Sequence, residues 1–397
     1  MNTKRALHWL LAFTSASLLA TTASAQGDAT TSSNATTDNT KTQPTNTVDA
    51  SGYLFTSSYT PQKDKTATEA PKEQLRWAGS SYFQQIGVSP DVIAPGLVQT
   101  YAPVADTFAA FAPRFAINKD WQLRARLTAS FEFTDNANST TTASRQLVFG
   151  DFTPEIDYRG IPKFAGIKML AALGTGVPTS AASQARTLIV SPFAKVIFDK
   201  AFEKIKWLGG GDVELILGAI FAHPFYASKT AQLDDTPQYS AACFGGGSDA
   251  SCANQASGAA NVENSLTGTA IAQAKWGKFS VIALYYLFNQ WTYQFQPEAG
   301  VEPEPNGNTN FRQSSYFNFG LDWDFNGWLT GELGYQMYRT ILTGESTIGN
   351  PFWDPYQDMR VYLGVNVALD ALYEAILGKK EDEGILRTKS EHRPFMF

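Results

Sequence analysis

Beyond its N-terminal leader, the sequence has no apolar run that approaches the ~18 residues needed for a transmembrane helix. Charged residues are also scarce, at 17% of the chain, and the formal net charge is −6. No basic cluster occurs outside the first few residues, so nucleic-acid binding has no electrostatic basis. We therefore expect neither a helical membrane protein nor a nucleic-acid partner.

Residues that carry acid–base chemistry are few. The chain has three histidines, of which only His223 and His392 follow the leader. The sequence contains no Gly-x-Ser-x-Gly, no His-Glu-x-x-His and no phosphate-binding loop. These absences predict a protein that is not an enzyme and has no catalytic residue, metal site or cofactor.

Cysteine is limited to Cys243 and Cys252, which lie in one segment rich in Gly, Ser and Ala. The sequence has no Cys-x-x-Cys, and no histidine lies near this pair to complete a metal site. In an oxidising compartment, two such cysteines predict a local disulfide that closes a loop.

The first 25 residues have the pattern of a secretory signal peptide. Lys4 and Arg5 precede a mostly apolar stretch from Ala6 to about Ala20, and Ala23-Ser24-Ala25 offers a small-residue cleavage site. Residues 26–74 are dominated by Thr, Ser, Asn, Asp and Ala, and they cannot bury enough apolar surface to fold. We predict a disordered polar periplasmic linker there.

The rest of the sequence is rich in aromatic residues, which make up 13% of the whole chain. Apolar and polar residues alternate there with a period of two. In 121–134 the odd positions from Trp121 to Phe133 are apolar, and the even positions from Gln122 to Thr134 are polar. Such alternation predicts strands with two different faces. Twelve segments have this character, some less regularly: 75–88, 106–117, 121–134, 147–158, 164–175, 187–199, 212–225, 265–276, 279–295, 316–325, 328–341 and 359–369.

The connections between these segments alternate in length. Tight turns are expected near 118–120, 160, 277–278 and 326–327, with one longer connection at 200–211 on the same side. The intervening connections are long and polar, as at 226–264. Alternating short turns and long loops are typical of barrels that cross an outer membrane.

Three features indicate that the apolar face meets lipid. Many of the strands have ten or more residues, which matches the ~9–11 tilted residues that cross a bilayer. Aromatics such as Trp121 and Trp323 gather near strand ends, and charges such as Arg126 and Glu132 occupy the other face in mid-strand. We predict an all-β fold, in which 75–369 forms a transmembrane antiparallel up-and-down β-barrel of about 12 strands. Residues 370–397 are then a periplasmic tail with a short helix at 370–378.

On this pattern, the chain from 77 to 369 resembles Gram-negative outer-membrane β-barrel proteins of the porin and transporter type. The resemblance implies an outer-membrane location, with membrane lipid and the barrel assembly machinery as partners. Members of this class end in an alternating strand with a terminal aromatic. Here the chain ends in Phe397, but Pro394 and the acidic residues before it interrupt the pattern, so the assembly signal is either Phe397 or the strand ending at Leu369.

The polar faces supply the candidate functional residues. Inward charges of both signs can select solutes by charge, and the predicted pore-lining residues are Arg124, Arg126, Glu132, Asp151, Glu155, Asp157, Lys168, Lys195, Asp322, Asp324, Glu332 and Arg360. We expect a channel for small solutes. A barrel of ~8 strands is filled by its own side chains, whereas 16–18 strands leave a channel. A barrel of twelve strands is intermediate, so the alternative that these charges form a plug of ion pairs remains open.

Two other functions remain open from the sequence. A non-conducting barrel would serve as a surface scaffold or envelope anchor. A lipid-modifying enzyme would place a His, a Ser and a polar partner near the outer rim, but His223 is followed two positions later by Phe225. A transporter of hydrophobic solutes, a variant of the channel, would need a lateral opening or an N-terminal plug, for which 85–105 is the candidate. The sequence leaves the solute and the oligomeric state open.

Overall fold

The computed structural model describes residues 75–93, 104–134, 145, 147–205, 208–229, 260–293, 310–341, 348–353 and 358–377. The predicted signal peptide and linker, the Cys243–Cys252 pair, His392 and Phe397 lie outside the described residues. No helix within the described part is long and apolar enough to cross a bilayer.

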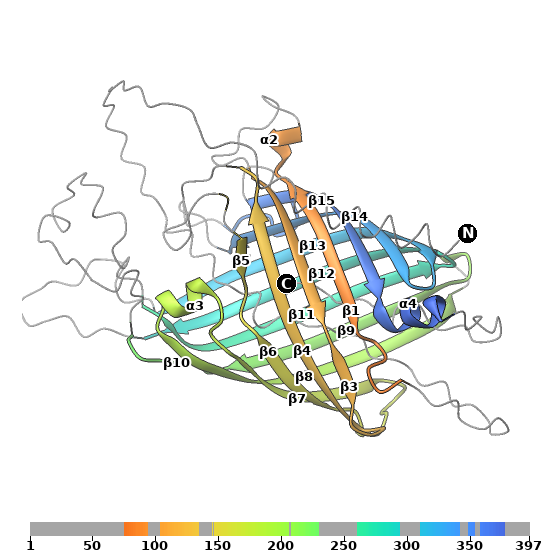
Figure 1. Ribbon diagram of the computed structural model, residues 1–397, viewed down its shortest axis with the longest axis horizontal. Helices are drawn as coiled ribbons and strands as arrows, with labels where there is room; N and C mark the ends of the chain where they lie inside the picture. Colours follow the sequence, from red (N-terminus) through yellow and green to blue (C-terminus); the bar gives the residue numbers. More distant parts are fainter. Residues whose placement is uncertain are drawn as a thin grey trace, which may run out of the picture.

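The described chain forms a closed antiparallel barrel of twelve strands (Figure 1). The strands are β1 (Ser81–Val88), β2 with β3 (Ala105–Ala112, Arg114–Ala116), β4 (Trp121–Glu132), β5 with β6 (Leu147–Phe149, Thr153–Tyr158), β7 (Lys168–Gly176), β8 (Leu188–Ile205), β9 (Gly211–Ala222), β11 (Val262–Trp276), β12 (Phe279–Thr292), β13 (Phe311–Asn326), β14 (Leu329–Thr340) and β15 (Asp358–Ala368). A short strand, β10 (Phe225–Tyr226), pairs with the start of β8. The predicted fold class and strand number are confirmed.

Closure comes from the pairing of the first and last strands. β1 pairs with β15 from Ser81↔Ala368 to Val88↔Val361, while its other edge pairs with β2. Each remaining strand pairs with neighbours close in sequence, which is the up-and-down order. The ring of strands therefore has no open end.

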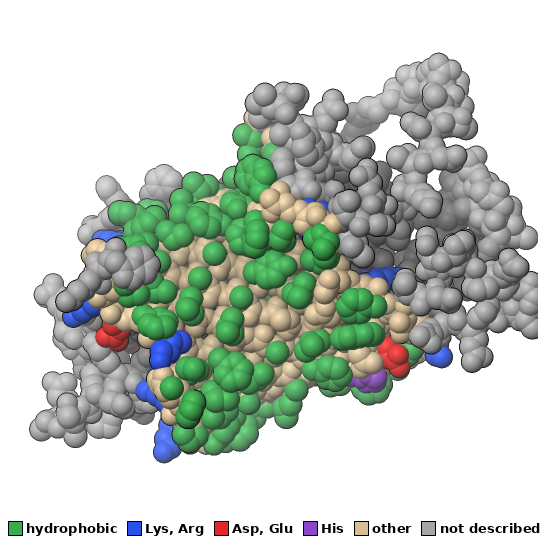
Figure 2. All heavy atoms as spheres, turned by 180° about the vertical axis from the view of Figure 1, so that it is seen from behind, with side chains coloured by type: hydrophobic (Ala, Val, Ile, Leu, Met, Phe, Trp, Pro, Cys, Tyr) green, Lys and Arg blue, Asp and Glu red, His purple; other side chains and the backbone are tan. Residues whose placement is uncertain are grey.

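The two faces of the barrel differ as the alternation predicts. In β4 the side chains of Gln122, Arg124 and Arg126 are buried inside the barrel, whereas Trp121 and Leu123 are exposed on the outside. Large apolar side chains are exposed on most of the other strands too, and Figure 2 shows them spread over one face of the outer surface, with charges mostly towards its ends. An apolar outside around a polar inside is the pattern of a barrel in a membrane.

Several predicted bounds change. Pro113 separates β2 from β3 because it has no N–H for the ladder, and residues 150–152 interrupt the predicted strand 147–158. The expected connection at 200–211 is wrong, because β8 continues to Ile205. Residues 85–88 belong to the barrel wall in β1, so a plug beginning at 85 is also wrong. Beyond β1 the short helix α2 (Pro90–Ile93) lies above the barrel (Figure 1).

The predicted C-terminal helix is confirmed as α4 (Leu369–Ile376), which begins one residue earlier than expected. It packs against the segment that leads into β1: Asp370 accepts a hydrogen bond from the N–H of Gly79 at 3.3 Å, and the rings of Trp77 and Tyr373 make an edge contact. The two ends of the barrel domain are thereby joined on the same rim.

The connections at that rim are short, such as 277–278 and 327–328, and we call it the short-turn rim. The long-loop rim is the opposite end, where helix α3 (Ala181–Ala185) lies between β7 and β8. Aromatic rings pack at the short-turn rim, as in the Trp121–Tyr158 contact at 4.7 Å. Aromatic residues at strand ends suit a membrane interface.

A cation placed in the middle of the outer face should destabilise the barrel. Leu217 lies near the centre of β9 and is 59% exposed. We expect Leu217→Arg to lower the free energy of unfolding by about 2–4 kcal/mol, because hydrocarbon solvates the charge poorly. Phe221→Arg, on the same face one residue from the strand end, should cost only about 0–1 kcal/mol. Urea unfolding in lipid vesicles measures both, and equal losses would contradict a lipid-facing surface.

Candidate functional site

The side chains predicted to line a pore lie inside the barrel. Eight are buried, namely Arg124, Arg126, Asp151, Asp157, Lys168, Lys195, Asp322 and Asp324. Four more have intermediate exposure and occupy the same inward positions of their strands: Glu132, Glu155, Glu332 and Arg360. The structure therefore gathers these residues in one lumen.

On one side of the lumen the charges form a dense network. The Arg124 guanidinium contacts Asp157 through Nε at 2.6 Å and Glu155 through Nη2 at 2.7 Å. Lys195 of β8 reaches Glu155 from the opposite direction. Arg114 of β3 is also buried here and interacts electrostatically with Arg124 and Asp157. These residues, on β3, β4, β6 and β8, form what we call the basic wall, because its cations outnumber its carboxylates.

Arg114 was missed by the sequence reasoning. It follows Pro113, and its ladder with β4 is only three residues long. Alternation over three residues is too short to identify which face a side chain occupies. The nearby Arg126 continues the basic wall towards the middle of β4.

Three carboxylates line the opposite side, which we call the acidic wall. Asp322 accepts a hydrogen bond from the Ser280 hydroxyl at 3.2 Å. Asp324 accepts one from Thr330 at 2.7 Å. The third, Glu332, accepts one from the Tyr362 hydroxyl at 2.5 Å. The donors in these three hydrogen bonds are the neutral hydroxyl groups of Ser280, Thr330 and Tyr362.

The two walls lie at a similar depth. Arg124 is three residues from the short-turn end of β4 at Trp121, and Asp322 is four residues from the short-turn end of β13 at Asn326. In the ring, four strands separate β4 from β13 on one side (β2, β1, β15 and β14) and six on the other. Opposed charges across a narrow lumen create a field perpendicular to its axis.

Between the walls, β7 to β13 contribute an apolar sector to the lumen. Its members form one cluster of buried side chains: Leu170, Ala172, Phe193, Ile197, Ile216, Ile220, Ala222, Ile271, Ile282, Leu284, Tyr286, Phe288 and Tyr316. The lumen is therefore not uniformly polar. It has a basic side, an acidic side and an apolar side.

Aromatic side chains of β12 and β13 pack inside the lumen. Arg126 of β4 interacts electrostatically with Tyr286 of β12, and five strands separate β4 from β12 in either direction round the ring. Tyr286 has 0% exposure, and its ring packs on Phe288 and Tyr316 at centroid distances of 6.0 and 6.1 Å. The hydroxyl of Tyr316 in turn donates to Gln336 at 3.0 Å. Tyr286 is therefore fully buried inside the lumen, between two other aromatic rings.

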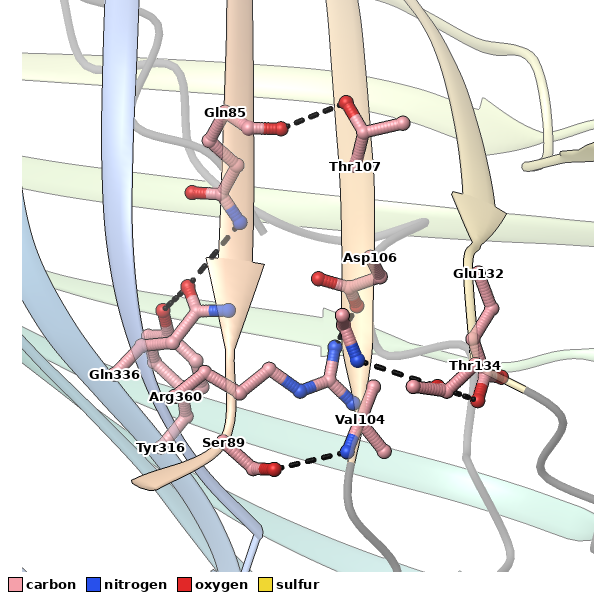
Figure 3. Close-up of polar contacts among 11 residues, drawn as sticks. Gln85, Ser89, Val104, Asp106, Thr107, Glu132, Thr134, Tyr316, Gln336 and Arg360 are labelled. Atoms are coloured by element: carbon pink, nitrogen blue, oxygen red, sulfur yellow. Dashed lines mark hydrogen bonds and ion pairs between the residues drawn. The ribbon is translucent and has the colours of Figure 1, made fainter. Parts of the chain in front are cut away.

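Nearer the long-loop rim an ion pair crosses β1 inside the barrel (Figure 3). Arg360 of β15 pairs with Asp106 of β2, and β1 lies between those strands. Gly87 of β1 makes this approach possible, because a Cβ there would lie 2.9 Å from Asp106 Oδ1 and 3.8 Å from Arg360 Cδ. Figure 3 also shows the Gln85–Gln336 contact beside this pair.

Other predicted residues have more local partners. Lys168 lies 3.9 Å from Asp199 near the short-turn rim. Glu132 accepts a hydrogen bond from the Thr134 hydroxyl at 2.8 Å near the long-loop rim. Asp151 holds the segment that carries α3, as described below. These groups do not join the basic or acidic wall.

His223 lies on the outer side of the long-loop rim, just after β9. Its Nδ1 is 2.8 Å from Asn264 Oδ1, and the Phe225 ring packs against the imidazole at 4.8 Å. Within the described residues no hydroxyl side chain bonds to this imidazole, so a nucleophile is not among its partners there. The same part of the chain holds no group of three His, Cys, Asp or Glu suited to a metal ion.

No family model matches the sequence, and no curated protein is significantly similar to it. Solved structures with a similar shape include an outer membrane channel from Pseudomonas putida F1, at 12% identity and a TM-score of 0.40 over 76% of this chain and 99% of that chain. The NanC porin has 9% identity and a TM-score of 0.36, over 73% and 98%. Outer membrane phospholipase A from Escherichia coli has 13% and 0.32, over 72% and 92%. Similarity at this level does not extend to any of their activities.

A closed antiparallel barrel with an apolar outer band and a polar interior is the architecture of outer-membrane barrels. The protein is an outer-membrane β-barrel of this kind. In such barrels the short turns face the periplasm and the long loops face the exterior. The short-turn rim is therefore periplasmic, and the long-loop rim is extracellular.

Breaking the basic wall should destabilise the barrel strongly. Arg124→Gln removes the closest cation of Asp157 and one of the two cations that pair with Glu155, and removing one partner of a buried pair costs about 3–5 kcal/mol. Lys278→Gln removes an exposed charge in a periplasmic turn and should change stability little. Guanidinium unfolding followed by tryptophan fluorescence compares them. A similar effect of both variants would show that the network contributes nothing to stability.

Proposed function

We propose that the protein is a channel that passes small solutes across the outer membrane through its charged lumen. The observation that carries this proposal is the pairing of a basic wall with an acidic wall at the same depth. A barrel that served only as an anchor would be filled more favourably by apolar side chains, because charges are costly to bury even when paired.

Unpartnered polar atoms in the lumen also support a hydrated interior. Among the described residues, the Oε1 atoms of Gln85 and Gln122 and the Oγ1 atom of Thr269 are buried without a protein hydrogen-bond partner. Buried polar atoms are nearly always satisfied, by protein or by water. Water beside these groups, on three different strands, would supply a polar path for solutes.

The surroundings of His223 favour a channel over an enzyme. The outward His223–Asn264 pair has the rim position of a lipid-modifying site, but Phe225 packs on the imidazole where such a site would need a hydroxyl. Single-channel recording in planar bilayers tests the proposal directly. Discrete conductance steps are expected, and a sealed record would favour the scaffold or anchor instead.

Truncating the Tyr286 side chain should widen the path through the lumen. We expect Tyr286→Ala to raise the single-channel conductance severalfold, because this side chain is fully buried inside the lumen and packs on Phe288 and Tyr316. Tyr285→Ala is the matched control, since its side chain is the adjacent tyrosine on the outer face and packs on Phe352. Equal conductance of the two variants would place the constriction elsewhere.

Charge selectivity should respond to each wall in opposite directions. Arg126→Gln removes a cation from the lumen and should shift the reversal potential in a KCl gradient towards cation preference. Asp322→Asn removes an anion at the acidic wall and should shift it towards anion preference. Shifts of the same sign, or none, would contradict conduction between the two walls.

A further inference from the structure

One edge inside the barrel wall is not closed by a ladder. β5 pairs with β4, but the pairing of β6 with β7 ends at Glu155↔Gly174. Beyond it there is one isolated bridge, Phe152↔Val177. Within the described residues, no strand pairs with the other edge of Leu147–Phe149. We call the boundary between 147–152 and 177–183 the lateral seam, and it lies in the extracellular part of the wall.

A threonine side chain takes the place of the missing ladder. Thr179 donates its hydroxyl hydrogen to the carbonyl of Gly150 at 3.0 Å and accepts a hydrogen bond from the N–H of Phe152 at 2.8 Å. A single hydroxyl therefore satisfies one donor and one acceptor of the strand edge. Unlike a backbone partner, a side chain can rotate away without moving a strand.

A carboxylate holds the other half of the seam. Asp151 Oδ1 accepts a hydrogen bond from the N–H of Ser180 at 2.9 Å, and Oδ2 accepts one from the Ser183 hydroxyl at 2.5 Å. Because Ser180 is the N-cap of α3, this contact fixes the helix against the wall. Figure 1 shows α3 at the rim beside the strand formed by β5 and β6.

The lipid-facing side of the seam is apolar, and its lumen side combines Phe193 with polar groups such as Asp151 and Glu155. Leu147 and Phe149 are more than half exposed on the lipid-facing side. On the lumen side, Phe193 closes the base of the seam, since a Cβ on Gly174 would lie 2.3 Å from its ring and 2.8 Å from the Glu155 side chain. Phe193 also belongs to the apolar sector of the lumen. Phe193 thus places an apolar side chain behind the seam, beside the charged Glu155. The hydrogen bonds of Thr179 and Asp151, which we call the latch, hold the seam closed.

We infer that the lateral seam is a port through which small apolar or amphipathic organic solutes pass between the lumen and the outer leaflet. This inference rests on the proposed channel function and specifies one class of its substrates. A hydrophilic solute gains nothing by entering hydrocarbon, because its polar groups lose their hydrogen bonds. An aromatic or aliphatic solute can move along the apolar sector and leave sideways.

A reversible lock tests the port. Phe152→Cys with Val177→Cys places two cysteines on a bridged antiparallel pair, where a disulfide fits. The background carries Cys243→Ser and Cys252→Ser, so that only the new bond forms. The readouts are uptake of N-phenyl-1-naphthylamine by intact cells, whose lipopolysaccharide excludes this apolar probe, and single-channel conductance in KCl. We expect oxidation to reduce probe uptake to the level of cells lacking the protein, with conductance unchanged, and a reductant to restore uptake.

Thr179→Val tests the same port without a new bond. Loss of the hydroxyl opens half of the latch and should raise probe uptake severalfold. The matched control is Thr134→Val, which removes a hydroxyl bonded to Glu132 and to the N–H of Ala105 where the β2–β4 ladder is complete. We expect the control to leave uptake unchanged.

The outcomes separate the two proposals. Probe uptake that ignores both the lock and Thr179→Val, in a protein that still conducts KCl, overturns the lateral port and leaves the axial channel. Conductance that falls when the seam is locked also overturns it, because ions and apolar solutes would then share one path. If neither the wild-type protein nor any variant conducts KCl or takes up the probe, the channel itself is overturned.

Discussion

The structure depends on the need of every backbone N–H and C=O in hydrocarbon to find a partner within the protein. For a sheet this requires a closed ring, and the ring closes where β1 meets β15. The number of strands in the closed ring sets its diameter, and twelve leave an interior narrow enough for side chains from opposite walls to interact. Arg126 and Tyr286 are such a pair. The charged lining and the constriction therefore follow from a backbone requirement.

The narrowness of the lumen explains why its charged side chains are paired or hydrogen-bonded within the protein. In a wide, water-filled channel, ionised side chains can stay fully hydrated. Here Arg124 is buried between Glu155 and Asp157, so the basic wall carries its own counterions. The carboxylates of the acidic wall accept hydrogen bonds from neutral hydroxyl groups instead. The apolar sector lies along β7 to β13, giving the lumen three chemically distinct sides.

Sequence alone could predict the barrel because lipid and lumen impose opposite chemistry on alternate residues. Strand β4 obeys this rule, and its inward arginines were identified. Tyr286 was not, because β12 is apolar on both faces and its alternation does not distinguish lumen from lipid. Asn264 was also missed, since 41 residues separate it from His223 and only register brings them together. The lateral seam could not be predicted either. The sequence indicates where strands lie, but only the pairing of the strands shows which strand edges have a hydrogen-bonded partner.

The ion pair that crosses Gly87 has a consequence for the order of assembly. Asp106 and Arg360 are 254 residues apart, and β1 must already lie between their strands before they can meet. A contact of such separation forms late, because the chain entropy of closing a long loop opposes it until other pairings have shortened the path. The Asp106–Arg360 ion pair can therefore form only when the barrel has closed. A barrel that had inserted with its first and last strands apart would hold two unmatched charges at the place where it should have joined.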